Sequence, residues 1–411
     1  MPFAAQARHV FSHPDCRRYL AARFLLMVAS MMISVAIGWQ IWDLTQSTLY
    51  LGYAGLAEFI PNILFALPAG QFADQHDRRF ILIGCLALFV GSAAALFLVS
   101  ISPHPSVLWI FIISAVTGLA RAYTAPANQS LLPLLVPTEM FPSAVALSAT
   151  AMKIATIFGP LLGGALNTLG TEVVYGVATV ILAAALIITT GYKIPLMAHN
   201  NTETGLEGLL AGIRYVRSQP VILGSISLDL FAVLLGGATA LLPVYASDIL
   251  HVGSTGLGLL RAAPGCGSAL MAVALSIWPL ERAIGPKLFI SVAIFGFATV
   301  VFGLSDSVSL SLFALLILGA ADMISVVIRQ TIVQIRTPNE MRGRVSSINW
   351  VFIGASNELG SFESGLTAAW FGTVPAVIFG GVGTLLVAAA WSGLFPALRR
   401  ADRMRGDQEP G

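Results

Sequence analysis

Charged residues are scarce in this chain. Only 10% of its 411 residues are Asp, Glu, Lys or Arg, whereas 56% are hydrophobic, and the mean hydropathy is +0.84. In a soluble chain of this length, about a quarter of the residues are charged and cover its surface. The composition therefore excludes an ordinary soluble protein and predicts a membrane protein.

Residues that commonly hold metals or carry out catalysis are also few or badly spaced. The three cysteines, Cys16, Cys85 and Cys266, have no spacing typical of a disulfide framework or a metal site. No zinc-binding motif, nucleophile elbow or ATP-binding loop is present. We therefore expect a protein without metal, cofactor or enzymatic activity.

Long hydrophobic runs are abundant. Windows of about 20 residues, long enough to cross the hydrocarbon core of a bilayer, predict about twelve spans, all helical. The first is too long for a signal-peptide core and lacks a small-residue cleavage site, so we expect it to remain in the mature protein. The spans lie near residues 19–45, 51–72, 80–101, 106–131, 140–166, 173–194, 221–247, 253–278, 286–305, 309–334, 345–370 and 374–398.

Lys and Arg lie on one side of these spans. The terminal tails and the even-numbered connections carry them, for example Arg78, Arg79, Lys287 and Arg400, whereas the odd-numbered connections have none. Because cytoplasmic loops carry the excess of Lys and Arg, both termini are predicted to be cytoplasmic. The basic clusters thus reflect topology, and we expect no binding of nucleic acid.

The two halves of the chain resemble each other. A shift of 201 positions aligns Gly118 with Gly319 and Gly159 with Gly360. Two repeats of six spans in the same orientation predict two bundles related by an axis along the membrane normal, with a substrate path between them. The predicted parts are an N-terminal bundle (1–195), a linker with an interfacial amphipathic helix (196–219), a C-terminal bundle (220–398) and a cytoplasmic tail (399–411).

The connection between spans two and three resembles a known loop signature. Its text, GQFADQHDRR, is similar to the signature of the major facilitator superfamily at Gly70, Asp74, Arg78 and Arg79. Asp77 stands where that signature usually has Gly, so the turn is expected to differ locally. The resemblance implies the major facilitator fold and a cytoplasmic gate formed by these four residues. The alternative is that Arg78 and Arg79 only mark the cytoplasmic side.

Further motifs support the same resemblance. Arg121 in span four looks like the arginine of the superfamily pattern, and span five contains GPLLGG, which is similar to a signature of its antiporters. The texts PANQSLLPLLVP and MRGRV resemble the drug:proton antiporter branch that includes macrolide and enterobactin exporters. Small residues at this spacing allow close helix packing, which we expect of Gly159, Pro160, Gly163 and Gly164.

Several ionisable or amide side chains lie inside the predicted spans, where each charge costs on the order of 3 kcal/mol unless it faces water or a partner. Their number favours a polar central cavity, although any one of them can equally belong to a structural ion pair. We hypothesise that Arg121 and Asp322 face a shared cavity. The candidates for lining it are Arg121, Asp322, Lys153, Arg261, Arg329, Gln40 and Asn357.

Proton coupling requires a carboxyl group that gains and loses a proton near ambient pH. The candidates are Glu58, Glu358 and Glu363 inside spans, with Asp43 near the outer end of span one. Asp229, in span seven, is interpreted instead as a structural partner for an arginine at the cytoplasmic end.

These observations predict a monomeric secondary transporter in the cytoplasmic (inner) membrane of a bacterium. It is expected to exchange inward-moving protons for an outward-moving amphipathic or hydrophobic small molecule, drug-like or siderophore-like, by alternating access. The alternatives are transport of a lysophospholipid or other lipid and, from another class, a membrane sensor or scaffold without transport. The intramembrane charges argue against the last, because a scaffold gains little from bearing their cost.

Overall fold

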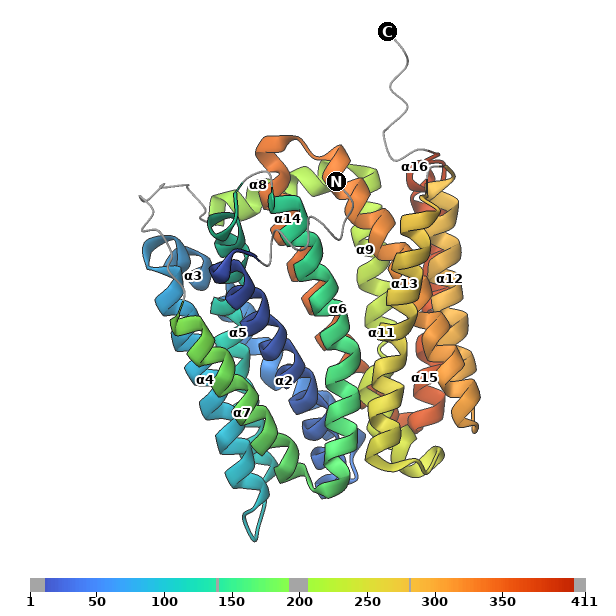
Figure 1. Cartoon of the computed structure of the whole chain (residues 1–411). Coiled ribbons are helices and arrows are strands. Elements are labelled where there is room, and N and C mark those ends of the chain that lie inside the picture. The colour runs from blue at the N-terminus through green and yellow to red at the C-terminus, as the bar shows by residue number, and fades with distance from the viewer. Residues whose placement is uncertain (1–11, 138–139, 192–205, 281, 403–411) are drawn as a thin grey trace. The chain divides into compact units, whose positions relative to one another are not determined.

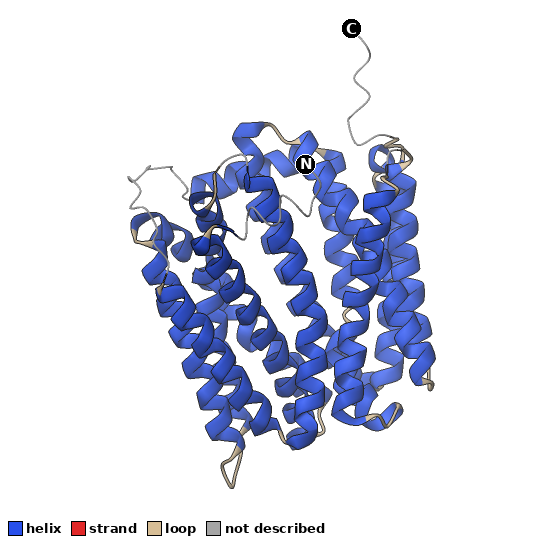
Figure 2. Cartoon of the chain, in the orientation of Figure 1, coloured by secondary structure: helices blue, strands red, loops and turns tan. Residues whose placement is uncertain are grey.

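The computed structural model describes residues 12–137, 140–191, 206–280 and 282–402, and every regular element within these ranges is a helix (Figures 1 and 2). Helices follow directly from the sequence, because a chain this apolar satisfies its backbone polar groups in lipid within each helix. The first half of the chain forms α2 (Pro14–Thr45), α3 (Thr48–Gln75), α4 (Arg78–Ser100), α5 (Val107–Leu135), α6 (Phe141–Leu166) and α7 (Thr171–Thr190).

The second half begins with a shorter helix, α8 (Leu206–Ser218), and a broken one. The long helices are α9 (Pro220–Leu235), α11 (Gly253–Ile277), α12 (Ile284–Gly303), α13 (Val308–Arg336), α14 (Asn339–Phe371) and α15 (Thr373–Leu394). Short elements connect or follow them: η2 (Asn167–Leu169), η3 (Ala238–Leu241), α10 (Leu242–Val244), η4 (Tyr245–Ile249) and α16 (Pro396–Arg399).

Eleven segments among the described residues are long and apolar enough to cross a membrane. The exception is α14, which spans 33 residues but carries Ser, Asn and Glu along its middle, including Glu358 and Glu363. Its length and its place in the second repeat make it the twelfth helix. The predicted fold class, an all-α membrane protein with twelve long helices, is confirmed.

The seventh span is not the continuous helix that its hydropathy predicts. Helix α9 ends at Leu235, and the chain continues through Gly236 and Gly237 into a 3₁₀ turn, a short α-helical turn and a π-helical turn before Leu250. A side chain at Gly237 would meet the backbone of Gly360 in α14, with the carbonyl oxygen at 2.6 Å. Gly237 thus lets α14 approach at the point where α9 ends.

The chain divides into two compact units, which cut across the two sequence halves. Unit 1 comprises Met1–Leu44, Ala57–Glu203 and Gly253–Ala262, and unit 2 comprises Thr45–Leu56, Thr204–Val252 and Ala263–Gly411. The first turns of α3 therefore belong with unit 2, and those of α11 belong with unit 1. The predicted division into bundles at residues 195 and 220 stays a prediction about the repeats.

Each unit has its own core of apolar side chains. In unit 1, Tyr19 and Ala29 of α2 are buried with Phe89 of α4 and Leu182 of α7, and α4 lies beside α7 (Figure 1). In unit 2, side chains of α9, α12 and α13 form the corresponding core, which contains Leu228, Leu288, Ile328 and Ile332. These cores hold fixed the helices that carry the ionisable residues.

A helix is present where the sequence predicts the amphipathic linker helix. Val216 of α8 is 5% exposed, Arg214 and Arg217 are exposed, and the Tyr215 hydroxyl donates to the carbonyl of Arg336 at 3.0 Å. Helix α8 therefore packs its apolar side on unit 2 and turns its basic side outward. Its predicted place on the membrane surface stays a prediction.

Candidate functional site

In each unit, an ion pair joins two different helices. In unit 1, the Nε atom of Arg121 in α5 lies 2.7 Å from the Oε1 atom of Glu58 in α3. The side chains are 36% and 26% exposed, so the pair is accessible rather than sealed. An ion pair that retains exposure can exchange partners at a smaller desolvation cost than a fully buried one.

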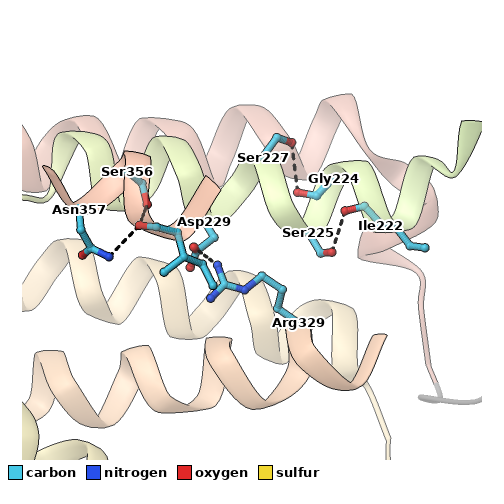
Figure 3. A network of polar contacts seen from close by, with 9 residues as sticks. Ile222, Gly224, Ser225, Ser227, Asp229, Arg329, Ser356 and Asn357 are labelled. Atoms are coloured by element: carbon cyan, nitrogen blue, oxygen red, sulfur yellow. Dashed lines mark hydrogen bonds and ion pairs between the residues drawn. The ribbon is translucent and has the colours of Figure 1, made fainter. Parts of the chain in front are cut away.

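The second ion pair, in unit 2, is almost completely buried. Arg329 of α13 and Asp229 of α9 are 2% and 7% exposed, and their charged groups are in contact. Figure 3 shows the two side chains pointing toward each other, and it also draws Ser356 and Asn357 of α14. The hydroxyl of Ser356 and the amide of Asn357 both donate to the carbonyl of Ile353, at 2.9 and 2.8 Å. The interpretation of Asp229 as an arginine's partner agrees with this contact.

Asp229 of this ion pair also lines a small cavity in unit 2. Asp229, Asp322, Ser291 and Ser325 line it together with apolar side chains of α9, α12 and α13. The structure thus places Asp322, a predicted cavity residue, in the lining of the same cavity as Asp229. Whether Asp322 also shares a cavity with Arg121 stays a prediction.

The other predicted cavity residues have different surroundings. Arg261 in α11 donates to the hydroxyl of Ser34 in α2 at 2.7 Å, within unit 1. Lys153 of α6 and Asn357 of α14 are exposed. The contact of these three residues with a substrate stays a prediction.

Gln40 has an environment that favours packing over contact with a substrate. It is 6% exposed, its amide nitrogen donates to the hydroxyl of Ser100 in α4 at 2.9 Å, and its amide oxygen accepts from the hydroxyl of Tyr175 in α7 at 2.9 Å. Both ends of the amide are thereby occupied. Gln40 joins three helices of unit 1.

The four predicted proton-coupling residues differ in their surroundings. Glu58 pairs with Arg121, as described above, and Asp43 is exposed near the end of α2. An Oε atom of Glu358 lies 3.0 Å from the position that a Cβ atom of Gly55 would occupy, so Glu358 points to the first turns of α3. Glu363 accepts from the hydroxyl of Thr367 at 2.8 Å. The role of each in coupling stays a prediction.

The residues of the predicted cytoplasmic gate lie at the junction of α3 and α4. Arg79 donates to the carbonyl of Thr190, and Arg18 of α2 donates to that of Gly191 at 2.9 Å, so two guanidinium groups hold the carboxyl end of α7. Cations are favourable at that end of a helix. Gly70 and Arg78 are partly exposed, and the side chain of Asp74 lies outside the described residues. Gating by these residues stays a prediction.

Asp77, which replaces the usual Gly of the loop signature, caps helix α4. Its φ and ψ angles, −63° and 116°, are ordinary extended values, and its carboxylate accepts from the backbone N–H of Arg79 at 2.8 Å. The turn therefore needs no left-handed residue here, and an N-cap replaces the flexibility of glycine.

Asp77→Ala is expected to lower the free energy of unfolding by about 1 kcal/mol, because one amide at the start of α4 loses its acceptor. Asp77→Ser should retain most of the stability, since Ser is also a good N-cap. The unfolding midpoints of the two purified variants in detergent give the comparison. Equal midpoints for Ala and Ser would contradict the capping role.

The glycines of the GPLLGG motif lie against neighbouring backbones. A Cβ atom at Gly163 would lie 3.0 Å from the Cα atom of Met32 in α2, and one at Gly164 would lie 2.7 Å from the Cα atom of Gly258 in α11. The side chain of Met31 fills the corresponding position at Gly159, and Pro160 is buried. These four residues of the motif thus occur where α6 meets other helices of unit 1.

Arg23 is a polar residue of span one that the sequence reasoning missed. It donates to the hydroxyls of Tyr19 and Ser148, both at 3.1 Å, and the hydroxyl of Tyr19 donates in turn to the carbonyl of Asn128 at 3.0 Å. A charge inside an apolar run is the signal that could have revealed it. This network links α2, α5 and α6.

The twelve long helices among the described residues define an integral membrane protein of the major facilitator fold. The chain belongs to the family described as transmembrane secretion effector (MFS_3), whose model matches residues 10–408. The predicted resemblance to the major facilitator superfamily is confirmed.

Curated relatives align over nearly the whole chain. The enterobactin exporter EntS of Citrobacter koseri is 28% identical over 401 residues, which cover 95% of this chain and 94% of the relative. The enterobactin exporter EntS of Escherichia coli O1:K1 is 26% identical over 390 residues, which cover 92% and 88%.

Solved structures share the fold at low sequence identity. A bacterial homolog of the human lysosomal transporter Spinster superposes with a TM-score of 0.75 at 14% identity, covering 92% of this chain and 96% of the other. A D-xylose-proton symporter superposes with a TM-score of 0.72 at 15% identity, covering 94% and 99%. These two likenesses concern the fold alone.

Proposed function

We propose that this protein is a secondary active transporter that exports a siderophore-like, amphipathic small molecule across the membrane. The observation that supports this function most strongly is the nearly full-length similarity to two enterobactin exporters, within a family of transmembrane secretion effectors. The fold agrees with it, because two repeated bundles of helices suit transport by alternating access.

The coupling ion in this proposal is the proton. Carboxyl groups inside the helical segments can bind a proton. The sequence contains no nucleotide-binding motif that would allow ATP to drive transport. The proposed transporter works as a monomer, without cofactor or catalysis, in the bacterial cytoplasmic membrane. The one-sided distribution of Lys and Arg supports cytoplasmic termini.

The intramembrane charges favour transport over a sensor or scaffold. The Arg121–Glu58 pair joins α5 to α3 within a helical region, and its side chains are 36% and 26% exposed. Charged residues inside membrane segments mark substrate or ion pathways more often than passive packing.

Transport into proteoliposomes under an imposed pH gradient tests the function. Inside-out protein should accumulate enterobactin when the lumen is acidic, and an ionophore that removes the gradient should reduce accumulation to the level of liposomes without protein. Dyes, macrolides and lysolipids are assayed in parallel to define the substrate class. Accumulation of none of these compounds would contradict export, and accumulation of lysolipids alone would replace the siderophore-like substrate by a lipid.

A further inference from the structure

Arg23 of α2 carries a guanidinium group whose hydrogen-bond partners in unit 1 are hydroxyl groups. Its Nη1 atom donates to the hydroxyls of Tyr19 and Ser148, both at 3.1 Å. The Nε and Nη2 atoms have no hydrogen bond to the described residues and are not sealed from solvent. These two nitrogen atoms form one edge of the guanidinium plane, which matches two neighbouring anionic oxygens. The protein thus holds one side of Arg23 and leaves the other side available to a ligand.

The carboxylates of unit 1 do not supply a counterion for Arg23. Among the residues of unit 1 that the structure describes, no carboxylate lies within ion-pair distance of it. Glu58, in the middle of α3, pairs with Arg121 instead. The others with described side chains lie at the ends of helices: Asp15, Asp43, Asp77 and Glu172. A guanidinium group inside a membrane segment is costly unless it meets water or an anionic partner.

Lys153 of α6 brings a second positive charge to the same region of unit 1. It follows Ser148, which binds Arg23, by five residues, a separation of about 7.5 Å along the helix axis. The side chain of Lys153 is exposed, and no described carboxylate lies within ion-pair distance of it either. Two cations without a described counterion therefore lie on neighbouring helices.

The position of Lys153 on α6 indicates that it faces the protein and not lipid. Residues eleven positions apart complete about three turns and share a face of a helix. Gly164, eleven positions after Lys153, lies against Gly258 of α11. Large apolar side chains are exposed on a different face of α6: Ile154, Phe158 and Leu162. Lys153 thus lies on the face that α6 turns to α11, where a charge can meet water or a ligand.

We propose that Arg23 binds an anionic group of the exported compound, a carboxylate or a deprotonated catechol, and that Lys153 attracts this group through its charge. Either group presents two neighbouring oxygens to the Nε and Nη2 atoms of Arg23. This inference rests on the proposed export, and it adds the charge of the substrate and the residue that recognises it.

An anionic compound fits this site better than a neutral or cationic one. Hydrogen bonds from a guanidinium group to an anion are about twice as strong as neutral ones. A cation would be repelled by both Arg23 and Lys153. The other intramembrane arginines of unit 1 have partners of their own, because Arg121 pairs with Glu58 and Arg261 of α11 donates to Ser34. Arg23 and Lys153 therefore carry the selection for negative charge.

Isothermal titration calorimetry of the purified protein in detergent tests the site without transport. The probes are protocatechuate, a catechol that carries a carboxylate, and its methyl ester, which has the same ring without that charge. The wild type should bind the carboxylate about tenfold more tightly than the ester, and Arg23→Gln should lose this preference, because Gln donates without a charge. Lys153→Gln should weaken binding of the carboxylate about two- to fivefold, and salt should remove this smaller effect, because the charge acts over a distance.

The matched control is Arg17→Gln, which changes an exposed arginine on another face of α2. It should keep both affinities. Equal affinities of the wild type for the carboxylate and the ester would overturn the proposal, as would wild-type affinities in Arg23→Gln. If Arg23→Gln does not fold, Lys153→Gln decides in the same way. Binding of phosphatidylglycerol without binding of the carboxylate would make this a site for anionic lipid and would overturn its assignment to a substrate.

Transport separates this proposal from the proposed function. If the wild type accumulates siderophore-like compounds in proteoliposomes but binds the carboxylate and the ester equally, the anion site is wrong and export stands. If the wild type transports nothing, yet prefers the carboxylate and loses this preference in Arg23→Gln, the proposed export fails and the anion site stands.

Discussion

Asp229→Leu is expected to lower the free energy of unfolding by about 3–5 kcal/mol, because it leaves the guanidinium group of Arg329 buried without its counterion. Arg329 is 2% exposed, and its Nε atom has no hydrogen-bond partner among the residues that the structure describes. The loss is therefore not offset by another contact on that atom. Arg329→Met should be similarly destabilising, because it leaves the carboxylate of Asp229 buried alone. Denaturant unfolding of the purified variants in detergent measures both effects.

The double variant Asp229→Leu with Arg329→Met is expected to recover most of the stability. Replacing both members of a buried pair by apolar side chains of similar volume is often neutral or stabilising. The matched control is Asp15→Leu, which removes the ion pair with Arg18 in a region where the side chains are 27% and 46% exposed. That change should cost less than about 1 kcal/mol. If the double variant lost as much free energy of unfolding as the two single variants together, the two residues would not be acting as a pair.

The general architecture was predictable because it follows from local properties of the sequence. Hydropathy predicts which segments cross the membrane, because it depends only on residues close together in the sequence. The alignment of Gly118 with Gly319 reveals the repeat, because a repeat is found by comparing the sequence with itself. The break after Leu235 was not predicted, because apolar residues continue beyond it. Only the approach of Gly360 to Gly237 shows why the helix ends there.

Partners of the ionisable residues were less predictable. Asp229 and Arg329 are 100 positions apart, and nothing in the sequence indicates which of several arginines faces that carboxylate. Gln40, a candidate for lining a cavity, has Ser100 and Tyr175 at the two ends of its amide, partners that the sequence does not indicate, and its contact with a substrate stays a prediction. Such choices depend on the rotation of each helix about its axis, which hydropathy determines poorly in helices that are apolar on every side.

The repeated glycines, Gly118 and Gly319, lie where two helix backbones cross closely and should tolerate any larger side chain poorly. In the structure, the carbonyl oxygen of Glu58 in α3 occupies the place where a Cβ atom at Gly118 would be, and the carbonyl oxygen of Pro264 in α11 occupies that place at Gly319. A methyl group at either position would have to push two helix backbones apart. Small residues at such crossings are what allows helices to pack closely in a membrane.

Gly118→Ala and Gly319→Ala are therefore each expected to lower the free energy of unfolding by about 1–3 kcal/mol, with larger losses for Val, because the obstacle is a backbone atom and not a flexible side chain. The controls are Gly91→Ala in α4 and Gly354→Ala in α14, where no atom lies within 4 Å of the added methyl group. At those positions the same substitution should raise stability by about 0.5–1 kcal/mol, since Ala loses less conformational freedom than Gly on forming a helix. A loss of stability at Gly118 and Gly319 together with a gain at Gly91 and Gly354 would show that the close crossing of helix backbones requires glycine in both repeats. Helix propensity alone would give the same sign at all four positions. Stabilisation by Ala at Gly118 or Gly319 would mean that the helices are farther apart there than the structure places them.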